Sequence, residues 1–232
     1  ATINASTYSG RLSIDGSATN QTITGGSDND TFVMAATLNN SDTITGGDGT
    51  DTMSATTTGL TATTGALNIS GVETLNFTNA GTQVIDATGI TGATSINTLT
   101  NTTQTTITNL ASGVAVGLGI DNTDGDVDGI MSVTLADSSG ASDSLTVNLN
   151  NTNGAQATTV DLRITAGVES VTLEVEDSTD TSNANATMDV DAINAATLLI
   201  TGSEADAGHT MGLGTLDTDT TTLDATGYSG IV

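Results

Sequence analysis

The chain has 232 residues, and its 27 Asp and Glu residues face only two basic residues, which gives a formal net charge of −25 at pH 7. This charge argues against nucleic acid and anionic membrane surfaces as partners, because both repel a chain of the same sign. Compaction is also costly, since two carboxylates about 4 Å apart repel by roughly 1 kcal/mol in water and by more near a protein surface. Because Arg11 and Arg163 cannot neutralise so many acids, we expect a bound cation to do so, and Ca²⁺ is the one best matched to carboxylate and carbonyl oxygen.

The composition also narrows the fold. The sequence has no Cys, Pro or Trp and only two Phe and two Tyr. Disulfides are therefore excluded as stabilisers, and narrow layers of small and β-branched side chains are expected in place of one thick core. Disorder is the alternative for so acidic a chain, but Ile, Val and Leu recur regularly between the polar residues. No apolar run is long enough to span a bilayer, so we expect no membrane insertion.

The first motifs lie in residues 16–54. Residues 46–54 fit the nonapeptide G-G-x-G-x-D-x-U-x at every defined position, residues 25–33 fit except that Asp28 replaces the third Gly, and residues 16–24 are a decayed copy. The glycines permit a tight turn that directs carbonyl oxygens inward. The sixth-position Asp supplies charge, and the apolar eighth residue starts a strand that faces the core. An Asp-Gly turn without metal is the alternative interpretation.

These residues resemble the calcium-binding RTX β-roll, in which Ca²⁺ lies between turns of neighbouring coils. The resemblance implies that the side-chain ligands are Asp30 and Asp51. It implies carbonyl ligands at Gly25, Ser27, Gly46 and Asp48.

The spacing of the two turns departs from that family. Gly25 and Gly46 are 21 residues apart, whereas two nonapeptides occupy about 18. We therefore expect extra residues to bulge out between 34 and 45, with an opposite turn at 39–42. This departure makes Asp28, Asp48 and Asp42 alternative ligands.

The remainder of the chain is predicted to form strands. Residues 105–108, 144–149 and 171–175 alternate apolar with polar side chains. Helix formers gather only in residues 183–200, and 197–201 again looks like a strand, so we expect little helix. Both a parallel solenoid and an antiparallel sandwich fit this pattern.

Two further segments, 70–77 and 166–173, share the phrase Gly-Val-Glu-[Thr/Ser]-apolar. Together with Asp-Ala-Thr-Gly phrases and Thr/Ala/Asn-rich strands, they resemble RTX-type surface-layer proteins of Gram-negative bacteria, such as the Caulobacter family. The resemblance implies export from the cell and assembly into calcium-dependent lattices outside it.

Residues 124–130 read Asp-Gly-Asp-Val-Asp-Gly-Ile, the opening of an EF-hand-like loop. Leu135 stands where such a loop needs a bidentate Glu, which excludes a helix-loop-helix site. A loop of this kind between strands can still hold Ca²⁺, and a solvated acidic turn is the alternative. The ligands would be the side chains of Asp124, Asp126 and Asp128 and the carbonyl oxygen of Ile130.

Other acidic residues carry weaker signals. Glu174, Glu176, Asp177 and Asp180 read as a solvated face, whereas Asp217, Asp219 and Asp224 stay open between metal and solvent. The single His209 is the only base suited to neutral pH, and nothing near it reads as a nucleophile elbow. We expect a surface histidine and a protein that is not an enzyme.

The two ends of the chain share a pattern. Residues 3–10 and 223–230 match in their apolar-Asp/Asn-Ala opening and their Tyr-Ser-Gly close, at an offset of 220 residues. We interpret residues 1–222 as one tandem-repeat module, with the calcium roll near 16–54 and a β-rich body at 55–222, and residues 223–232 as the start of the next copy. Residues 1–12 and 223–232 should then lie at opposite ends of an elongated module.

The sequence thus predicts an all-β fold in which a short RTX-like calcium β-roll joins stacked β-solenoid or β-sandwich layers. The expected function is structural, as a module of a secreted, calcium-dependent bacterial surface layer, sheath or filament. The expected partners are Ca²⁺ and copies of the chain itself, with cell-surface polysaccharide as a further candidate. An extender or ligand-binding module of a giant RTX adhesin is the alternative.

Overall fold

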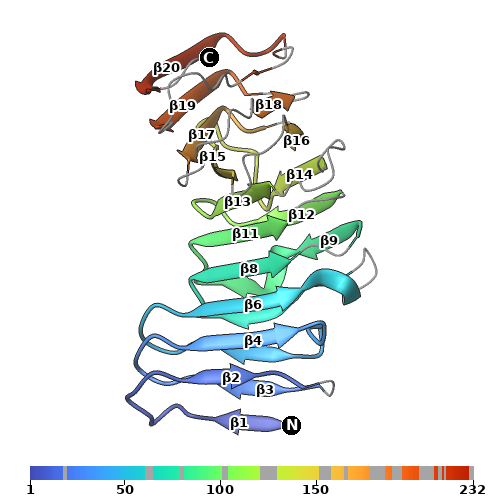
Figure 1. Cartoon of the computed structure of the whole chain (residues 1–232), viewed down its shortest axis with the longest axis vertical. Coiled ribbons are helices and arrows are strands. Elements are labelled where there is room, and N and C mark those ends of the chain that lie inside the picture. The colour runs from blue at the N-terminus through green and yellow to red at the C-terminus, as the bar shows by residue number, and fades with distance from the viewer. Residues whose placement is uncertain are drawn as a thin grey trace.

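A computed structural model describes residues 1–17, 20–60, 65–78, 81–100, 104–120, 130–151, 158–164, 167–177, 186–189, 195–203, 212–213, 216 and 218–229. The described chain winds into an elongated β-solenoid with its first and last strands at opposite ends (Figure 1). All strand pairs are parallel, and each pairs with a strand one circuit, or coil, away. The all-β prediction is therefore confirmed, and the parallel pairing identifies the body as a solenoid.

Three sheets run along the solenoid. Sheet A contains β1 (Thr2–Asn4), β3 (Thr22–Thr24), β5 (Thr43–Thr45), β7 (Asn68–Ser70) and β10 (Ile90–Thr91). Sheet B contains β2 (Ser13–Asp15), β4 (Thr31–Ala35), β6 (Thr52–Thr56), β8 (Thr74–Thr78), β11 (Ser95–Thr100), β13 (Ala115–Ile120), β15 (Ser144–Asn151), β17 (Ser170–Asp177), β19 (Thr197–Ser203) and β20 (Thr222–Tyr228). Sheet C contains β9 (Gln83–Asp86), β12 (Thr105–Leu110), β14 (Ile130–Leu135), β16 (Thr158–Ile164) and β18 (Ala186–Asp189). The helices described are two 3₁₀ turns, η1 (Thr57–Gly59) and η2 (Ala87–Gly89), and none in the described part of the chain is long and apolar enough to cross a membrane.

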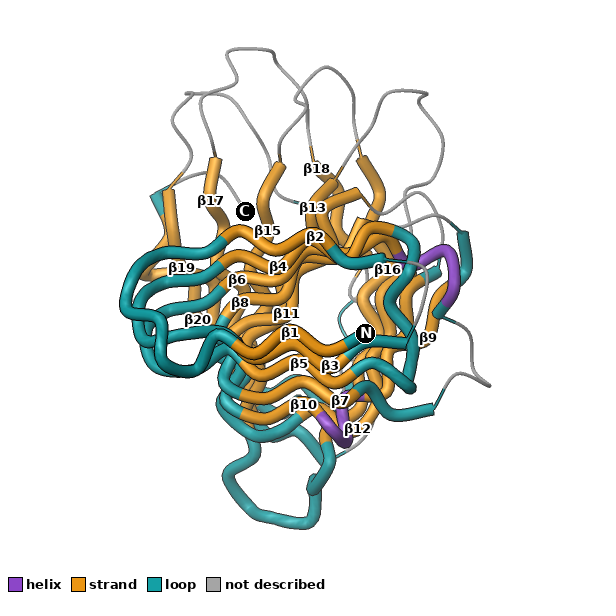
Figure 2. The backbone as a smooth tube through the Cα atoms, turned by 90° about the horizontal axis from the view of Figure 1, so that it is seen from below, coloured by secondary structure: helices purple, strands orange, loops and turns teal. Residues whose placement is uncertain are grey.

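The alternating strands bury apolar side chains that stack from coil to coil. Ile23, Ile44 and Ile69 stack in register on sheet A, while the strands of sheet B stack Phe32, Met53 and Leu75. Both stacks belong to one buried cluster that runs through the solenoid. Viewed along the axis, the strands of successive coils superimpose around this interior (Figure 2). Short β-branched side chains suit so narrow a core, because each needs to reach only the facing sheet.

The predicted opposite turn at 39–42 is confirmed. The N–H of Asp42 donates to the carbonyl oxygen of Asn39 over 3.1 Å, and the pairing of β4 with β6 shifts register between Val33 and Ala35. These irregularities accommodate the extra residues of a coil that runs 21 residues from Thr31 to its partner Thr52. The decayed nonapeptide at 16–24 falls on the same side of the solenoid as this turn, because it connects β2 to β3.

The final strand, β20, pairs with β19 as a further member of sheet B. Residues 1–12 lie at one end of the solenoid and 223–229 at the other (Figure 1), as the sequence predicts. The expected boundary between residues 222 and 223 falls inside β20, where Thr222 pairs with Thr197 and Leu223 with Leu198, so the last strand is structurally part of the same stack.

The isoleucine stack yields a stability prediction. Replacing Ile44, which is fully buried between Ile23 and Ile69, by Ala should lower the free energy of unfolding by about 2–5 kcal/mol, because a cavity remains in the core. The neighbouring exposed Thr43 offers a matched control, and its change to Ala should alter that free energy by no more than about 0.5 kcal/mol. Urea unfolding of both variants measures the difference, and similar losses would contradict the assigned register.

Candidate metal centre

The best candidate site is a column of carboxylates at one corner of the solenoid, formed by Asp30, Asp51 and Glu73, which we call the acidic column. Each of these residues immediately precedes a strand of sheet B. The N–H of Leu12 donates to Oδ1 of Asp30 over 2.9 Å. The N–H of Asp30 donates to Oδ1 of Asp51, and that of Asp51 donates to Oε2 of Glu73, both over 2.7 Å. Each carboxylate thus satisfies a backbone donor of the preceding coil.

The two sixth-position Asp side chains point inward. Asp30 is 2 % exposed and Asp51 is fully buried. Both oxygens of Asp30 are occupied, because its Oδ2 accepts the N–H of Gly26 over 2.7 Å. Oδ2 of Asp51, in contrast, is buried without a hydrogen-bond partner. Burying a carboxylate oxygen without a hydrogen-bond partner costs folding free energy, and Oδ2 of Asp51 carries this cost.

The electrostatics of Asp51 reflect that position. Burial raises the pKa of its carboxyl above the ordinary value, the hydrogen bond from Asp30 opposes the rise, and the negative charges of Asp30 and Glu73 add to it. The group therefore favours either a proton or a cation. Both would remove the same uncompensated charge.

Glycines allow a carbonyl oxygen to lie close to each of these carboxylates. A Cβ on Gly46 would overlap Oδ2 of Asp51 and the carbonyl oxygen of Gly71. One coil earlier, a Cβ on Gly25 would overlap the carbonyl oxygen of Gly46 and would lie 2.6 Å from Oδ2 of Asp30. At both turns a carboxylate and a carbonyl oxygen converge over a residue that must be Gly. Such an all-oxygen donor set fits Ca²⁺, and the unpaired oxygen makes the fit better at Asp51 than at Asp30.

The other predicted ligands lie further out on the turns. Asp48 is exposed, and Asp28 is partly exposed with its Oδ1 accepting the N–H of Asn29 over 2.8 Å. The N–H of Ser27 donates to the carbonyl oxygen of Tyr8 over 3.1 Å. The described residues contain no group of three or more acidic or His side chains arranged to hold a metal ion. A cation here would therefore rely on carbonyl oxygens together with one or two carboxylates.

The two nonapeptide turns also differ in backbone conformation. Gly47 and Gly49 have left-handed φ values of 121° and 117°, whereas Asp28, which stands in the place of Gly49, does not have a positive φ. A left-handed conformation disfavours residues other than Gly. The turn with the complete motif is therefore the one that takes up the glycine-dependent shape.

Asp42 lies away from the acidic column. It is buried at the opposite turn, where its Oδ1 accepts the N–H of Gln21 over 2.8 Å and its Oδ2 accepts the N–H of Asn39 over 2.9 Å. These hydrogen bonds complete a structural cap for that turn. The structure thus gives Asp42 a role in turn stability.

The sequence did not identify Glu73 or Glu169 as site residues. Glu169 accepts the N–H of Asp143 through Oε2 over 2.7 Å, and this repeats the bond between Glu73 and Asp51. In both copies of the Gly-Val-Glu phrase, the Gly has a left-handed φ and the Val is buried. The Gly-Val-Glu phrase therefore encodes a hydrogen bond between coils. Its recurrence in the sequence was the signal that could have identified Glu73 and Glu169.

Several predicted residues fall outside the described chain. The loop at 121–129, which holds Asp124, Asp126 and Asp128, is among them, and Ile130 is the first residue of β14. Residue His209 and the acids Asp180 and Asp217 also lie outside the described residues.

The Asp-Ala-Thr phrases have a local explanation. Oδ1 of Asp224 accepts the N–H and the hydroxyl of Thr226, and Asp86 does the same with Thr88. At the other end of the chain, Oδ1 of Asn4 accepts the N–H of Ser6 over 3.0 Å. The shared opening of residues 3–10 and 223–230 thus makes the same local bond to the N–H two residues on, at the end of β1 and within β20.

No protein-family model, curated protein or solved structure matches the chain. The likeness to RTX proteins therefore rests on the nonapeptides and the composition.

The raised pKa of Asp51 gives a prediction with a definite sign. Because its folded-state pKa lies above 3.8, the ionised group opposes folding at neutral pH, and protonation removes this penalty as the pH falls through the raised value towards 3.8. Without Ca²⁺, Asp51→Asn should therefore be more stable than the wild type at pH 7, and the difference should shrink towards about pH 4. The fraction of folded protein in chelator, measured by circular dichroism from pH 7 to about pH 4, compares the two proteins.

An exposed acid of the same turn, Asp48, serves as the control. The difference in stability between Asp48→Asn and the wild type should change little with pH. If the stability difference between the wild type and Asp51→Asn stays constant with pH, the burial of an uncompensated charge at this position is contradicted.

Proposed function

We propose that the chain is a structural module of a secreted, calcium-dependent bacterial surface layer, sheath or filament that self-assembles outside the cell. The observation that carries the proposal is the buried, unpaired Oδ2 of Asp51 over Gly46. It lies in a nonapeptide turn that resembles the RTX motif, in a chain with a net charge of −25.

The residues that would hold Ca²⁺ are Asp51 with the carbonyl oxygen of Gly71, and Asp30 with that of Gly46. The ion would supply the positive charge that the sequence lacks. The negative charges of Asp30 and Glu73 contribute to the raised pKa of Asp51. Neighbouring carboxylates of the column therefore repel one another along the solenoid axis. Lowering that repulsion stabilises the folded chain relative to the unfolded one, in which the acids separate.

The position of the column connects cation binding to the whole fold. Its carboxylates accept backbone N–H groups of neighbouring coils, so ordering the column holds the first strands of sheet B in register. In a repeat architecture the stability of each coil depends mainly on its neighbours. Calcium outside the cell would thus favour folding there, while the chain would stay unfolded where calcium is scarce.

This proposal predicts calcium-linked folding. Chelator should remove most of the β-sheet circular dichroism signal, and Ca²⁺ at roughly 10⁻⁴–10⁻³ M should restore it. Asp51→Asn should weaken the calorimetric response to Ca²⁺ more than Glu174→Gln, because Glu174 is an exposed residue on β17. An unchanged spectrum in chelator, or equal effects of the two variants, would overturn specific ligation.

Self-assembly is supported by the two ends of the solenoid. Ile3 on β1 is 37 % exposed and Leu223 on β20 is 45 % exposed, although both continue apolar stacks of the core. Edge strands also present unpaired backbone groups that another chain can pair with. A neighbouring module stacked on either end would bury these side chains.

The assembly prediction uses adjacent residues of β20. In Ca²⁺, Leu223→Lys should shorten or abolish filaments or lattices seen by electron microscopy, because a charge would enter the stacked core. Thr222→Lys changes an exposed neighbour on the same strand and should leave assembly intact. Assemblies of full length in both variants would show that the ends of the solenoid do not mediate association.

A further inference from the structure

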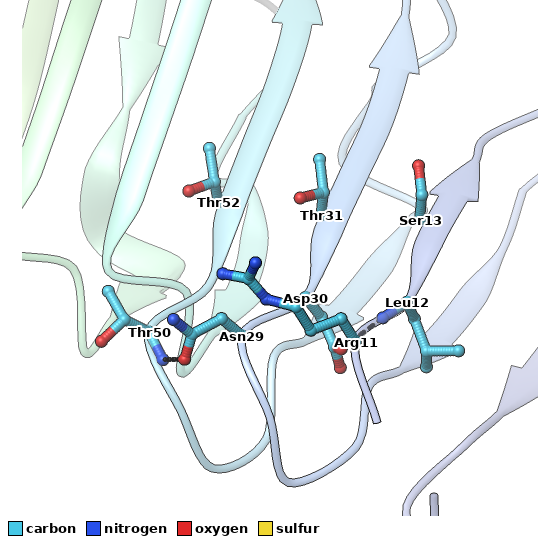
Figure 3. A pocket seen from close by; sticks show the side chains of 8 residues that line it. All are labelled: Arg11, Leu12, Ser13, Asn29, Asp30, Thr31, Thr50 and Thr52. Atoms are coloured by element: carbon cyan, nitrogen blue, oxygen red, sulfur yellow. Dashed lines mark hydrogen bonds between the residues drawn. The ribbon is translucent and has the colours of Figure 1, made fainter. Parts of the chain in front are cut away.

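A second polar feature lies beside the acidic column, on the outer face of sheet B. A cavity of about 540 Å³ opens there, within the volume range of small-ligand sites. Its floor carries Ser13, Thr31 and Thr52, which are aligned on β2, β4 and β6 and therefore repeat about every 4.8 Å. The lining residues, drawn in Figure 3, are Arg11, Leu12, Ser13, Asn29, Asp30, Thr31, Thr50 and Thr52.

Arg11 distinguishes this cavity from the rest of the surface. It is one of two basic residues in the chain, and within the part that the structure describes it makes no hydrogen bond or salt bridge. Figure 3 shows its side chain extending from the Leu12 side of the cavity towards Asn29 and Thr52. An exposed guanidinium without a carboxylate partner is notable in so acidic a protein.

The side-chain oxygens of Asp30 and Asn29 in the cavity wall each already accept a backbone N–H. Oδ1 and Oδ2 of Asp30 accept backbone N–H groups, and Oδ1 of Asn29 accepts the N–H of Thr50 over 2.9 Å. The groups left for a ligand are the guanidinium, the amide N–H₂ of Asn29 and the hydroxyls of the floor. These are mainly donors, together with hydroxyls that can donate or accept, so the complementary ligand carries an anionic acceptor among hydroxyl groups.

We infer that this cavity binds a sugar that carries a carboxylate, of the uronic acid class. Arg11 would hold the carboxylate through its two-pronged guanidinium. The hydroxyl row and Asn29 would hold the ring hydroxyls. The site is separate from the better of the two proposed cation positions, because Asp51 does not line the cavity and the guanidinium repels cations.

Nearby acids set the strength of binding. Asp15 is exposed on β2, two residues from Ser13, and Asp28 and Asp48 lie on the adjacent turns. Their repulsion makes the affinity weak, with a dissociation constant on the order of 1 mM. At physiological ionic strength, salt screens charges that lie more than about 8 Å away, so it reduces the repulsion from the more distant acids. Asp15→Asn should strengthen binding.

The test is a titration of the full chain with D-glucuronate, followed by NMR shifts of the Asn29 side-chain amide and by calorimetry. Glucuronate should bind at least about tenfold more tightly than glucose or the methyl ester of glucuronate, because only glucuronate has the charged acceptor. Arg11→Gln should abolish this preference. Arg163→Gln removes the other cation of the chain, on β16, and should leave it unchanged.

Circular dichroism confirms that each variant is folded, and Thr31→Val provides a second probe that should weaken binding of all three sugars. Equal affinity for glucuronate and glucose would overturn the proposal, as would equal effects of the two Arg variants. Failure of glucuronate to bind, together with a self-association that Arg11→Gln abolishes, would overturn it in favour of a contact with acidic residues of a second copy. None of these outcomes depends on whether Ca²⁺ drives folding.

Discussion

Stacking identical corners of a β-solenoid places like charges about one strand spacing apart, and this chain places carboxylates there. Asp30, Asp51 and Glu73 occupy equivalent positions on three successive coils and each accepts a backbone N–H from the preceding coil. The same groups therefore hold the coils together through hydrogen bonds and push them apart through charge. The cation proposed above would shift this balance towards the hydrogen bonds by reducing the repulsion.

The column also explains why the nonapeptide glycines and acids occur together. At Gly46 the oxygens of Asp51 and Gly71 occupy the volume that a side chain would fill. The glycine thus permits the approach of the oxygens, and the acid makes that approach costly unless its second oxygen finds a partner. At Asp30 the N–H of Gly26 is that partner, whereas Asp51 has none. Two turns with nearly the same sequence therefore differ in whether the second oxygen of their Asp has a hydrogen-bond partner.

The sequence predicted the features that depend on neighbouring residues. Period-2 alternation identified β15 and β17, and the apolar eighth positions Phe32 and Met53 are buried in register as expected. The turn at 39–42 followed from counting residues between two motifs. The parallel arrangement could not be derived in this way, because aligned residues are 18 positions apart at Ser13 and Thr31 but 31 apart at Val116 and Val147. The recurring Gly-Val-Glu phrase marks Glu73, but the partner of Glu73 could not be derived, since it is a backbone N–H 22 residues away. Neither leaves a local pattern that assigns its partner.

The uneven coil length has a geometric consequence for any assembly of this chain. The coils near β1 pair through sheets A and B, whereas those near β20 pair through sheets B and C and are longer. The outline of the solenoid therefore differs between its two ends, and the outermost strands belong to different sheets. A two-fold symmetric contact would join the same end of two chains and would give a closed dimer. Joining one end to the other would use two unlike surfaces and could repeat without limit, so a fibre built in this way would have a direction, with every subunit pointing the same way.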